Sequence, residues 1–468
     1  MPFIPHTQQD IDEMLAATGN KSLNDLFSEI PAHLQLKQLP NTPSGMNEIE
    51  MARYMQMLAD KDKYQLCFNG AGAYEHHIPA AVWDIASRGE FMTAYTPYQA
   101  EASQGTLQLI YEYQSMICEL MASEIANASL YDGATALAEA ILMAARSQRK
   151  QKQFTVLLPE TLNPLYRQVV ATIIAQQNVN IIDIPFDKNT GQIDFKALQN
   201  VTEKEITALV IPQPNFFGQL EDVDKLTDWA HTKDIIAIAV VNPTAMALLT
   251  PPGQWGETGA DIICGEGQPL GIPLASGGPY FGFMCCKLAY ARQMPGRIVG
   301  KTTDMNGKEG YTLTLQAREQ HIRRSKATSN ICTNQGLAVT AATIYMSLLG
   351  YQGLRQVALK SHQNTAKLLA MLAEQLAIKP YFTKNYFHEA VLQLPVCVQT
   401  VRQLMAKEGI EAGIDISKDY PQLRNALLVC VTETKTEADL ALFVDKLSQA
   451  IHQLSLAKKS EKVEGSTC

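Results

Sequence analysis

The sequence predicts an α/β fold, with a large domain built on a mainly parallel sheet and a smaller C-terminal α+β domain. Between about residues 67 and 330, short apolar runs rich in β-branched residues alternate with helical patterns. Continuous apolar strands are typical of parallel sheets covered on both faces, and their alternation with helices implies right-handed crossovers. The strands we expect are 154–158, 179–184, 208–211, 235–241 and 261–264, with helices at 162–176 and 223–231 between them.

An N-terminal segment precedes this large domain, which we place at residues 66–332. Residues 1–65 are expected to form a helical arm. Thr7 followed by Asp10 has the pattern of a capping box. Three prolines interrupt the stretch further on, which argues against a compact domain of its own.

A smaller domain follows the large one. We place it at residues 333–457, which begin with a long linking helix and contain expected strands at 390–394 and 426–431. A last helix is predicted to begin at Thr436, where a second capping-box pattern occurs. The polar residues 458–468 are expected to be a disordered tail.

The composition is that of a soluble globular protein, with 46% hydrophobic and 18% charged residues. No apolar run approaches the ~18 residues that a membrane-spanning helix needs, and the N-terminus lacks the features of a secretory signal. A net charge of −8 argues against general nucleic-acid binding. The nine cysteines include no CxxC spacing, so we expect neither a metal site nor a disulfide framework, and we expect a cytoplasmic location.

One helix start has the composition of an anion-binding turn. Gly133 and Thr135 lie where the first main-chain N–H groups of a helix over 137–146 point outward. Such N–H groups and the helix dipole favour a negative charge. An ordinary capped helix start fits the same residues, so the pattern alone leaves both interpretations open.

A basic run precedes the long helical pattern and consists of Arg318, His321, Arg323, Arg324 and Lys326. It forms either a solvated face or the rim of a site for a phosphate or carboxylate. Five cations this close repel one another. We therefore expect at least one arginine to point inward and to pair with a buried carboxylate or an anion.

Four segments taken together resemble one known family. They are residues 70–74 with 78–79, residues 95–99 with 103–105, residues 127–133, and residues 318–324 with 326–333. Their order and spacing are similar to those of the P-protein of the glycine cleavage system. The resemblance is to its N-terminal half, which some bacteria make as a separate subunit of glycine decarboxylase, and it covers nearly the whole chain.

The resemblance implies the fold of pyridoxal-phosphate (PLP) dependent transferases of fold type I, the aspartate-aminotransferase-like architecture, with active sites at a dimer interface. The family's oxidoreductase decarboxylates glycine and passes the aminomethyl group to the lipoyl group of the H-protein, and PLP accepts the carbanion electrons. The partners implied for this chain are a PLP-binding subunit 2 in an α2β2 heterotetramer, the H-protein and glycine. Neither nucleic acid nor a membrane is implied.

The chain departs from the catalytic half of that family at two positions. In the run 265–273, Gln268 stands where the Schiff-base lysine would be, and a carboxamide cannot form an imine with pyridoxal. Val241 ends the strand at which an aspartate facing the pyridine nitrogen would sit. The turn at Gly133 and Thr135 keeps the form of the family's phosphate-binding turn. We therefore expect a degenerate cofactor site that binds no PLP covalently, and a chain without catalytic residues of its own that is inactive alone.

Tyr95, Tyr98 and Gln99 resemble a segment that can approach the partner's active site in this fold. We expect them to complete the glycine pocket of subunit 2 from across the interface, although aromatic residues also seal interfaces without any chemical role. A second class of function is also open. An autonomous PLP enzyme would need another lysine, for which Lys301 and Lys326 are the candidates.

Overall fold

The computed structural model of the chain describes residues 5–36, 39–62, 66–148, 153–202, 205–275, 278–331, 335–382 and 385–464, with side chains described through residue 456. The chain divides into two units, Met1–Lys63 and Tyr64–Cys468, and each is considered by itself. The second unit contains the sheets and every residue that the sequence analysis selected for a site.

The first unit is helical. Thr7 Oγ1 accepts the N–H of Asp10, and the Asp10 carboxylate accepts the N–H of Thr7, so the predicted capping box is present. Asn47 and Glu50 form a second capping box. Among the described residues of this unit Leu15 is the buried hydrophobic one, so the unit has almost no core of its own. Its elements are α1 (Gln8–Ala17), the 3-10 helices η1 (Leu23–Phe27) and η2 (Ala32–Leu34), and α2 (Glu48–Ala59).

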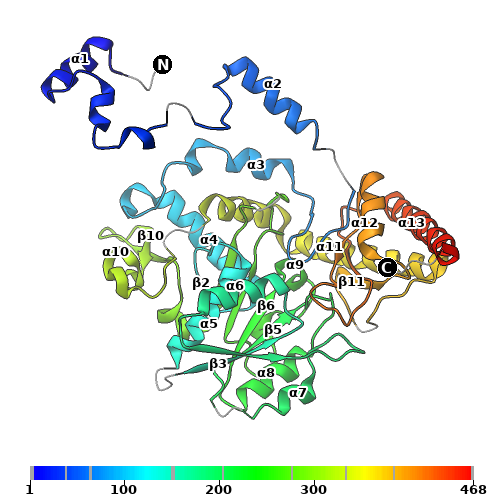
Figure 1. The fold of residues 1–468 in the computed structure, drawn as a ribbon. Coiled ribbons are helices and arrows are strands. Elements are labelled where there is room, and N and C mark those ends of the chain that lie inside the picture. Colours follow the sequence, from blue (N-terminus) through cyan, green and yellow to red (C-terminus); the bar gives the residue numbers. More distant parts are fainter. Residues whose placement is uncertain are drawn as a thin grey trace. The chain divides into compact units, whose positions relative to one another are not determined.

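The second unit is organised around a central sheet (Figure 1). This sheet has seven strands in the order β2-β8-β7-β6-β5-β3-β4. β8 is antiparallel to both of its neighbours, and the other pairs are parallel. The five predicted strands are confirmed, whereas β2 and β8 were not predicted. The strands are β2 (Ile125–Ala126), β3 (Phe154–Pro159), β4 (Val179–Ile184), β5 (Ala208–Gln213), β6 (Ile236–Val241), β7 (Ile262–Glu266) and β8 (Gly282–Cys286).

Helices cover both faces of this sheet, which explains why a central strand such as β6 is apolar throughout. In β5, Ala208 and Val210 pack in one core cluster with α5 and α6, and Leu209 and Ile211 pack in the other with α4, α8 and α11. The helices and short elements before β9 are α3 (Ala80–Ala86), η3 (Gly89–Phe91), η4 (Ala100–Ala102), α4 (Gln104–Met121), α5 (Gly133–Ser147), α6 (Pro164–Ile174), α7 (Phe195–Gln199), α8 (Val223–His231), α9 (Pro243–Met246), η5 (Pro252–Gln254) and η6 (Leu288–Gln293).

An antiparallel hairpin follows the main sheet and carries the basic run at its end. Strand β9 pairs with β10 from Ile298 opposite Thr314 to Thr303 opposite Glu309. The elements of this region are β9 (Ile298–Thr303), β10 (Glu309–Thr314), η7 (Gln316–Arg318), α10 (Gln320–Arg323) and η8 (Arg324–Lys326).

Helix α11 (Gly336–Leu376) leads from the large domain to the small one. Gly350 has φ 58° and ψ −174°, so the helix is interrupted there, as only glycine readily allows. An 18-residue window of α11 has a mean hydropathy of 1.2, and by length and composition it is able to cross a membrane. However, 44% of that window is buried, including Val339 and Ala342, as in a core helix of a globular protein.

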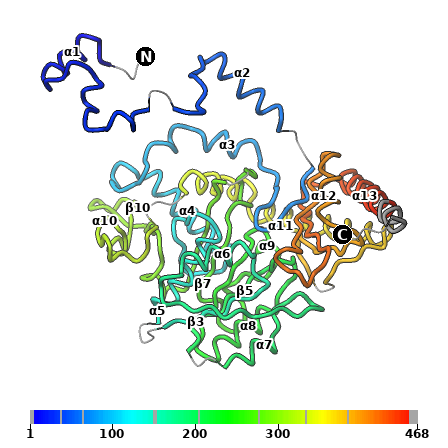
Figure 2. Tube along the Cα trace, viewed as in Figure 1, coloured from blue at the N-terminus to red at the C-terminus, as the bar shows by residue number. Residues whose placement is uncertain are grey.

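The small domain packs helices against a three-stranded sheet with the order β11-β14-β13. The first strand of the second unit lies beside this small domain. It is β1 (Leu66–Cys67), which pairs with β12 (Ile410–Glu411), the blue and orange traces of Figure 2. Helix α13 extends to Glu464 and so covers residues 458–464, where the sequence predicted a disordered tail; residues 465–468 lie outside the described part. The other elements are β11 (Glu389–Gln393), α12 (Val398–Lys407), β13 (Ile414–Asp415), β14 (Ala426–Cys430) and α13 (Glu437–Glu464).

Candidate functional site

Gln268 lies two residues after β7, and its side-chain amide forms hydrogen bonds to buried main-chain groups of the protein. The residue is 1% exposed. Its amide oxygen accepts the N–H of Tyr74 at 2.8 Å, and its amide nitrogen donates to the carbonyl oxygens of Tyr74 and Ile272, each at 2.8 Å. Every hydrogen-bonding position of this amide nitrogen therefore has a partner. The residue that the sequence analysis matched to the cofactor lysine is therefore a structural amide.

Val241 ends β6 and belongs to the apolar core of the sheet, with 3% of its surface exposed. It offers no charge to a pyridine nitrogen. The next residue, Asn242, caps α9 through its side-chain oxygen, which accepts the N–H of Ala245 at 3.1 Å. The Asn242 amide also lies 3.4 Å from Nε2 of His388. Burial and the neighbouring His76 keep the pKa of His388 well below its usual range, so this imidazole is neutral.

The start of α5 is occupied by carboxyl groups of the chain itself. Asp132 is the N-cap, and its carboxylate accepts the N–H of Thr135 at 2.8 Å. The N–H of Gly133 donates to Oε2 of Glu266, at the end of β7, at 2.9 Å. Gly133 is needed here, because a Cβ on it would lie 2.3 Å from the hydroxyl oxygen of Tyr166. The turn thus keeps the form of an anion site, but its N–H groups are bound by carboxyl groups of the chain itself.

Glu266 is held from several directions. Its Oε1 accepts the N–H of Gln268 at 3.0 Å and that of Phe281 at 3.3 Å, in addition to the bond from Gly133 to Oε2. Burial raises its pKa to about 8, with a contribution from the nearby Asp132, while the three N–H donors act in the opposite direction. A second carboxyl group would meet the same desolvation, so a further anion is disfavoured beside it.

A second buried carboxyl group lines the same cavity as Glu266 and comes from the small domain. Glu389, in β11, accepts the N–H of Ala71 at 2.7 Å and the hydroxyl of Tyr74 at 2.9 Å. Burial raises its pKa to about 7. Gly70 is required for this approach, because a Cβ on Gly70 would lie 2.2 Å from Oε1 of Glu389. The glycine-rich segment that resembles the family's is therefore a close contact between segments distant in sequence.

The cavity that remains between these groups is too small for PLP. It has a volume of about 70 Å³, whereas small-molecule sites typically enclose roughly 300–1,000 Å³. It is lined by Gly72, Tyr74, Leu162, Asn163, Tyr166, Pro212, Pro214, Asn215, Phe216, Val240, Val241, Asn242, Gly265, Glu266 and Glu389. No lysine is among the described residues that line this cavity, and the start of α5 is already bound to Glu266. The residues present therefore do not fit PLP.

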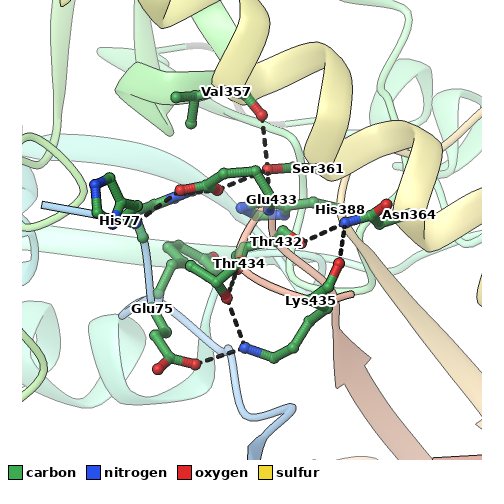
Figure 3. Close-up of polar contacts among 12 residues, drawn as sticks. Glu75, His77, Val357, Ser361, Asn364, His388, Thr432, Glu433, Thr434 and Lys435 are labelled. Carbon is green, nitrogen blue, oxygen red and sulfur yellow. Dashed lines mark hydrogen bonds and ion pairs between the residues drawn. The ribbon is translucent and has the colours of Figure 1, made fainter. Parts of the chain in front are cut away.

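The segment after Tyr74 is fastened to the small domain by buried polar contacts (Figure 3). The Glu433 carboxylate accepts the main-chain N–H of His77 at 2.7 Å. The Lys435 ammonium donates to the Glu75 carboxylate at 2.5 Å. Asn364, in α11, donates to the carbonyl oxygen of Lys435 at 2.9 Å. These contacts hold the segment after Tyr74 in one position against the small domain.

Tyr95, Tyr98 and Gln99 lie together on the surface between η3 and η4. Tyr95 is 91% exposed and Tyr98 50% exposed, and Gln99 is exposed as well. The ring of Tyr98 makes an edge contact with that of His321, at 5.0 Å between centroids. The structure therefore brings this segment and the basic run to one place.

The basic run has one arginine that points inward. Arg318 donates to the carbonyl oxygens of Leu315 at 3.1 Å, of Gly296 at 3.0 Å and of Met294, and burial lowers its pKa. These acceptors are main-chain carbonyls and not the expected carboxylate or anion. The other members, His321, Arg323, Arg324 and Lys326, are exposed.

The two lysines considered for an autonomous enzyme do not line the cavity. Lys301 lies on the hairpin and pairs with Glu309 at 2.6 Å, and Lys326 is exposed on η8. Within the described part of the chain, no group of three or more His, Cys, Asp or Glu side chains is placed to hold a metal ion.

Three residues were missed by the sequence analysis. Glu266 ends β7 and Glu389 begins β11, and a lone carboxyl group beside each predicted apolar run was a usable signal. Arg297 is a lone charge between Pro295-Gly296 and an apolar strand, and its side chain is 2% exposed. Neither burial nor partners of these charges follow from local sequence.

Comparison with known proteins gives the family. The family model described as glycine cleavage system P-protein matches residues 1–447. A relative in Legionella pneumophila (strain Lens), called probable glycine dehydrogenase (decarboxylating) subunit 1, is 59% identical over 447 residues, covering 96% of this chain and 98% of that protein. One of the same description in Coxiella burnetii (strain Dugway 5J108-111) is 60% identical over 447 residues, covering 96% and 99%.

Comparison with solved structures gives the same family and shows the fold. A crystal structure of glycine decarboxylase (P-protein) of the glycine cleavage system in inhibitor-bound form has a TM-score of 0.84 and 39% identity, covering 96% of this chain and 100% of that one. Sphingosine-1-phosphate lyase of Burkholderia pseudomallei, at 14% identity and a TM-score of 0.66 over 92% of this chain and 95% of its own, shares the fold. The expected architecture, PLP-dependent fold type I, is confirmed. The chain belongs to the glycine cleavage system P-protein family.

Proposed function

We propose that this chain is the subunit of glycine decarboxylase that does not bind PLP. It pairs with a catalytic subunit 2 in a cytoplasmic α2β2 complex, which decarboxylates glycine and passes the aminomethyl group to the lipoyl group of the H-protein. One observation carries the proposal: the amide of Gln268, at the lysine position, is bound on all sides by Tyr74 and Ile272. A P-protein family member with this site needs a partner to supply the cofactor.

The contribution of this chain comes from its exposed aromatic segment. PLP on subunit 2 supplies the electron sink. Tyr95, Tyr98 and Gln99 present two hydroxyl groups and an amide on the surface. Across an interface they orient glycine by hydrogen bonds and exclude water from its pocket, which raises the electrostatic contribution of neighbouring groups. If these residues only seal the interface, their hydroxyl groups have no effect on turnover.

Two measurements on purified proteins test the proposal. The first is carbon dioxide release from carboxyl-labelled glycine in the presence of H-protein, for each subunit alone and for the co-expressed pair. We expect activity with the pair, and light scattering should show a stable complex. Full activity of subunit 2 alone would make this chain dispensable and contradict the proposal.

The second measurement addresses the cofactor. The isolated chain is mixed with PLP, reduced with borohydride and analysed by mass spectrometry. We expect no stoichiometric pyridoxyl adduct. An adduct on Lys301 or Lys326 at near-equimolar yield would support the autonomous enzyme instead. Replacing Tyr95 and Tyr98 by phenylalanine in the pair then separates a role in turnover from interface sealing, because phenylalanine keeps the ring and removes the hydroxyl group.

A further inference from the structure

A buried arginine lies beneath the exposed segment of Tyr95 to Gln99. The side chain of Arg297, which precedes β9, is 2% exposed, although a guanidinium stays charged at any physiological pH. A charge is seldom buried to this extent unless other groups balance it. The groups around Arg297 therefore indicate its role.

The main chain of Arg297 is held in place on both sides. Its carbonyl oxygen accepts the N–H of Ala128 at 2.7 Å. The carbonyl oxygen of the preceding Gly296 accepts a hydrogen bond from the Arg318 guanidinium at 3.0 Å. Gly296 has a φ of 74°, a conformation that favours glycine, and it turns the chain into β9. The side chain of Arg297 thus projects from a fixed point.

Among its contacts with the described part of the chain, the guanidinium of Arg297 lies near three side chains. Its Nη2 lies 3.4 Å from Oγ1 of Thr96, its centre lies 5.6 Å from the centroid of the Tyr98 ring, and its Nε lies 3.7 Å from Oε2 of Glu319. Glu319 also lies 3.7 Å from Nδ1 of His321, whose ring contacts that of Tyr98. The contacts close into a ring, in which a cation over an aromatic face is favourable. Tyr98 and His321 are the members of this ring of contacts that reach the surface, and Tyr98 is 50% exposed.

We propose that Arg297 is the positioning residue for Tyr98. Its charge, balanced by Glu319, fixes the 96–98 segment so that the Tyr98 hydroxyl is presented to the glycine pocket of the partner subunit. This inference rests on the proposed function of the aromatic segment. Lysine cannot replace Arg297, because a compact ammonium cannot contact the ring face, Thr96 and Glu319 at the same time.

The first experiment uses the full-length chain without its partner. Chymotrypsin cleaves after aromatic residues, so cleavage after Tyr95 and Tyr98, normalised to cleavage elsewhere in the chain, reports on the order of this segment. We expect Arg297→Lys and Arg297→Met to speed this cleavage about tenfold, since local opening exposes the backbone. Arg167→Met is the control, because Arg167 is an arginine outside this region whose side chain is 24% exposed and pairs with Asp183 at 2.8 Å. Cleavage of the Arg297 variants at the wild-type rate would overturn the inference.

The second experiment uses the co-expressed pair and asks whether Arg297 acts through Tyr98. We expect Arg297→Lys to lower kcat/KM for glycine about tenfold, and to change it less than about twofold when Tyr98→Leu is already present, because coupled residues are not additive. If the two substitutions lower kcat/KM by independent factors that multiply, Arg297 does not act through Tyr98. If Arg297→Met does not fold, Glu319→Gln removes the balancing carboxylate and should act in the same direction. A wild-type chain that fails to raise the activity of subunit 2 refutes the proposed function, while the cleavage experiment still decides whether Arg297 orders Tyr98.

Discussion

Gln268 and Tyr74 are joined by two antiparallel hydrogen bonds, each 2.8 Å long. The N–H of Tyr74 donates to the Gln268 amide oxygen, and the Gln268 amide nitrogen donates to the Tyr74 carbonyl oxygen, across 194 positions in sequence. The Gln268 side chain thus pairs with the main chain of Tyr74 as a neighbouring strand does, and it ties the segment after β7 to the segment around residue 74.

The first prediction concerns this tie. Gln268→Met keeps the approximate size of the side chain but leaves the N–H and carbonyl groups of Tyr74 and the carbonyl of Ile272 without these bonds. We expect the free energy of unfolding, measured in urea, to fall by roughly 2–4 kcal/mol, because buried polar groups lose their partners. Gln108→Met is the control. Gln108 is exposed on α4 and bonds only to Glu112 among its described partners, so a change within about 0.5 kcal/mol is expected.

A lysine introduced at position 268 should not by itself create decarboxylase activity. In Gln268→Lys, Val241 still provides no carboxylate, and the start of α5 is still bound to Glu266. We expect no glycine decarboxylation by this variant without subunit 2, measured as labelled carbon dioxide, and no stoichiometric pyridoxyl adduct after borohydride reduction. Turnover by the single variant in the absence of subunit 2 would show that the cleft is still able to hold the cofactor.

Removal of Glu266 should uncover the anion site that its carboxyl group fills. Glu266→Ala leaves the N–H groups of Gly133, Gln268 and Phe281 without their acceptor, which should cost roughly 1–3 kcal/mol of stability. Inorganic phosphate should raise the Tm of this variant more than chloride of equal ionic strength does, and should have no such effect on the wild type.

Glu221→Ala is the control for that measurement. Glu221 is also a buried carboxyl group, with a pKa that burial raises to about 7. Its Oε2 accepts the N–H of Ile193 at 2.9 Å, and Ile193 lies before the N-cap of α7 and not in the first turn of a helix. Equal responses of the two alanine variants to phosphate would mean that the carboxyl group of Glu266 is not a substitute for a bound anion.

The buried Glu389 predicts a specific dependence of stability on pH. Burial raises its pKa from 4.5 to about 7 in the folded protein, so the folded chain binds this proton more tightly than the unfolded one. The contribution of this proton to the free energy of unfolding is fully present below pH 4.5. It is lost as the pH rises to about 7, a change on the order of 3 kcal/mol. Glu389→Gln should remove this part of the slope in urea unfolding between pH 5 and pH 7.5. Glu309→Gln, at an exposed carboxylate with a lowered pKa, should leave the slope unchanged.

The basic run should respond unequally to charge reversal. Arg318→Glu places a carboxylate among the carbonyl oxygens of Met294, Gly296 and Leu315, so we expect a loss of about 3 kcal/mol or more in thermal or urea unfolding. Arg323→Glu changes an exposed residue and should shift stability by no more than about 0.5 kcal/mol. Similar losses in both variants would show that the run acts as a unit.

The elements of the large sheet could be predicted because their signal is local. Strands such as β5 and β6 are uninterrupted apolar runs, and a strand buried on both faces needs no other information to be recognised. β8 was missed because its run, Gly282–Cys286, is short and rich in residues without strong strand preference. Its antiparallel place beside β7 depends on the chain reversal before it.

By itself the sequence determined the fold class, the family and the absence of a lysine at Gln268 and of a carboxylate at Val241, because these depend only on which residues stand at which positions. The tertiary structure decided what replaced them. Glu266 binds the start of α5, Glu389 reaches Ala71 across 318 positions, and the guanidinium of Arg297 lies against Tyr98. A charged residue gives no sign in the sequence of whether it will be solvated or buried, because its partners are set by packing between distant segments.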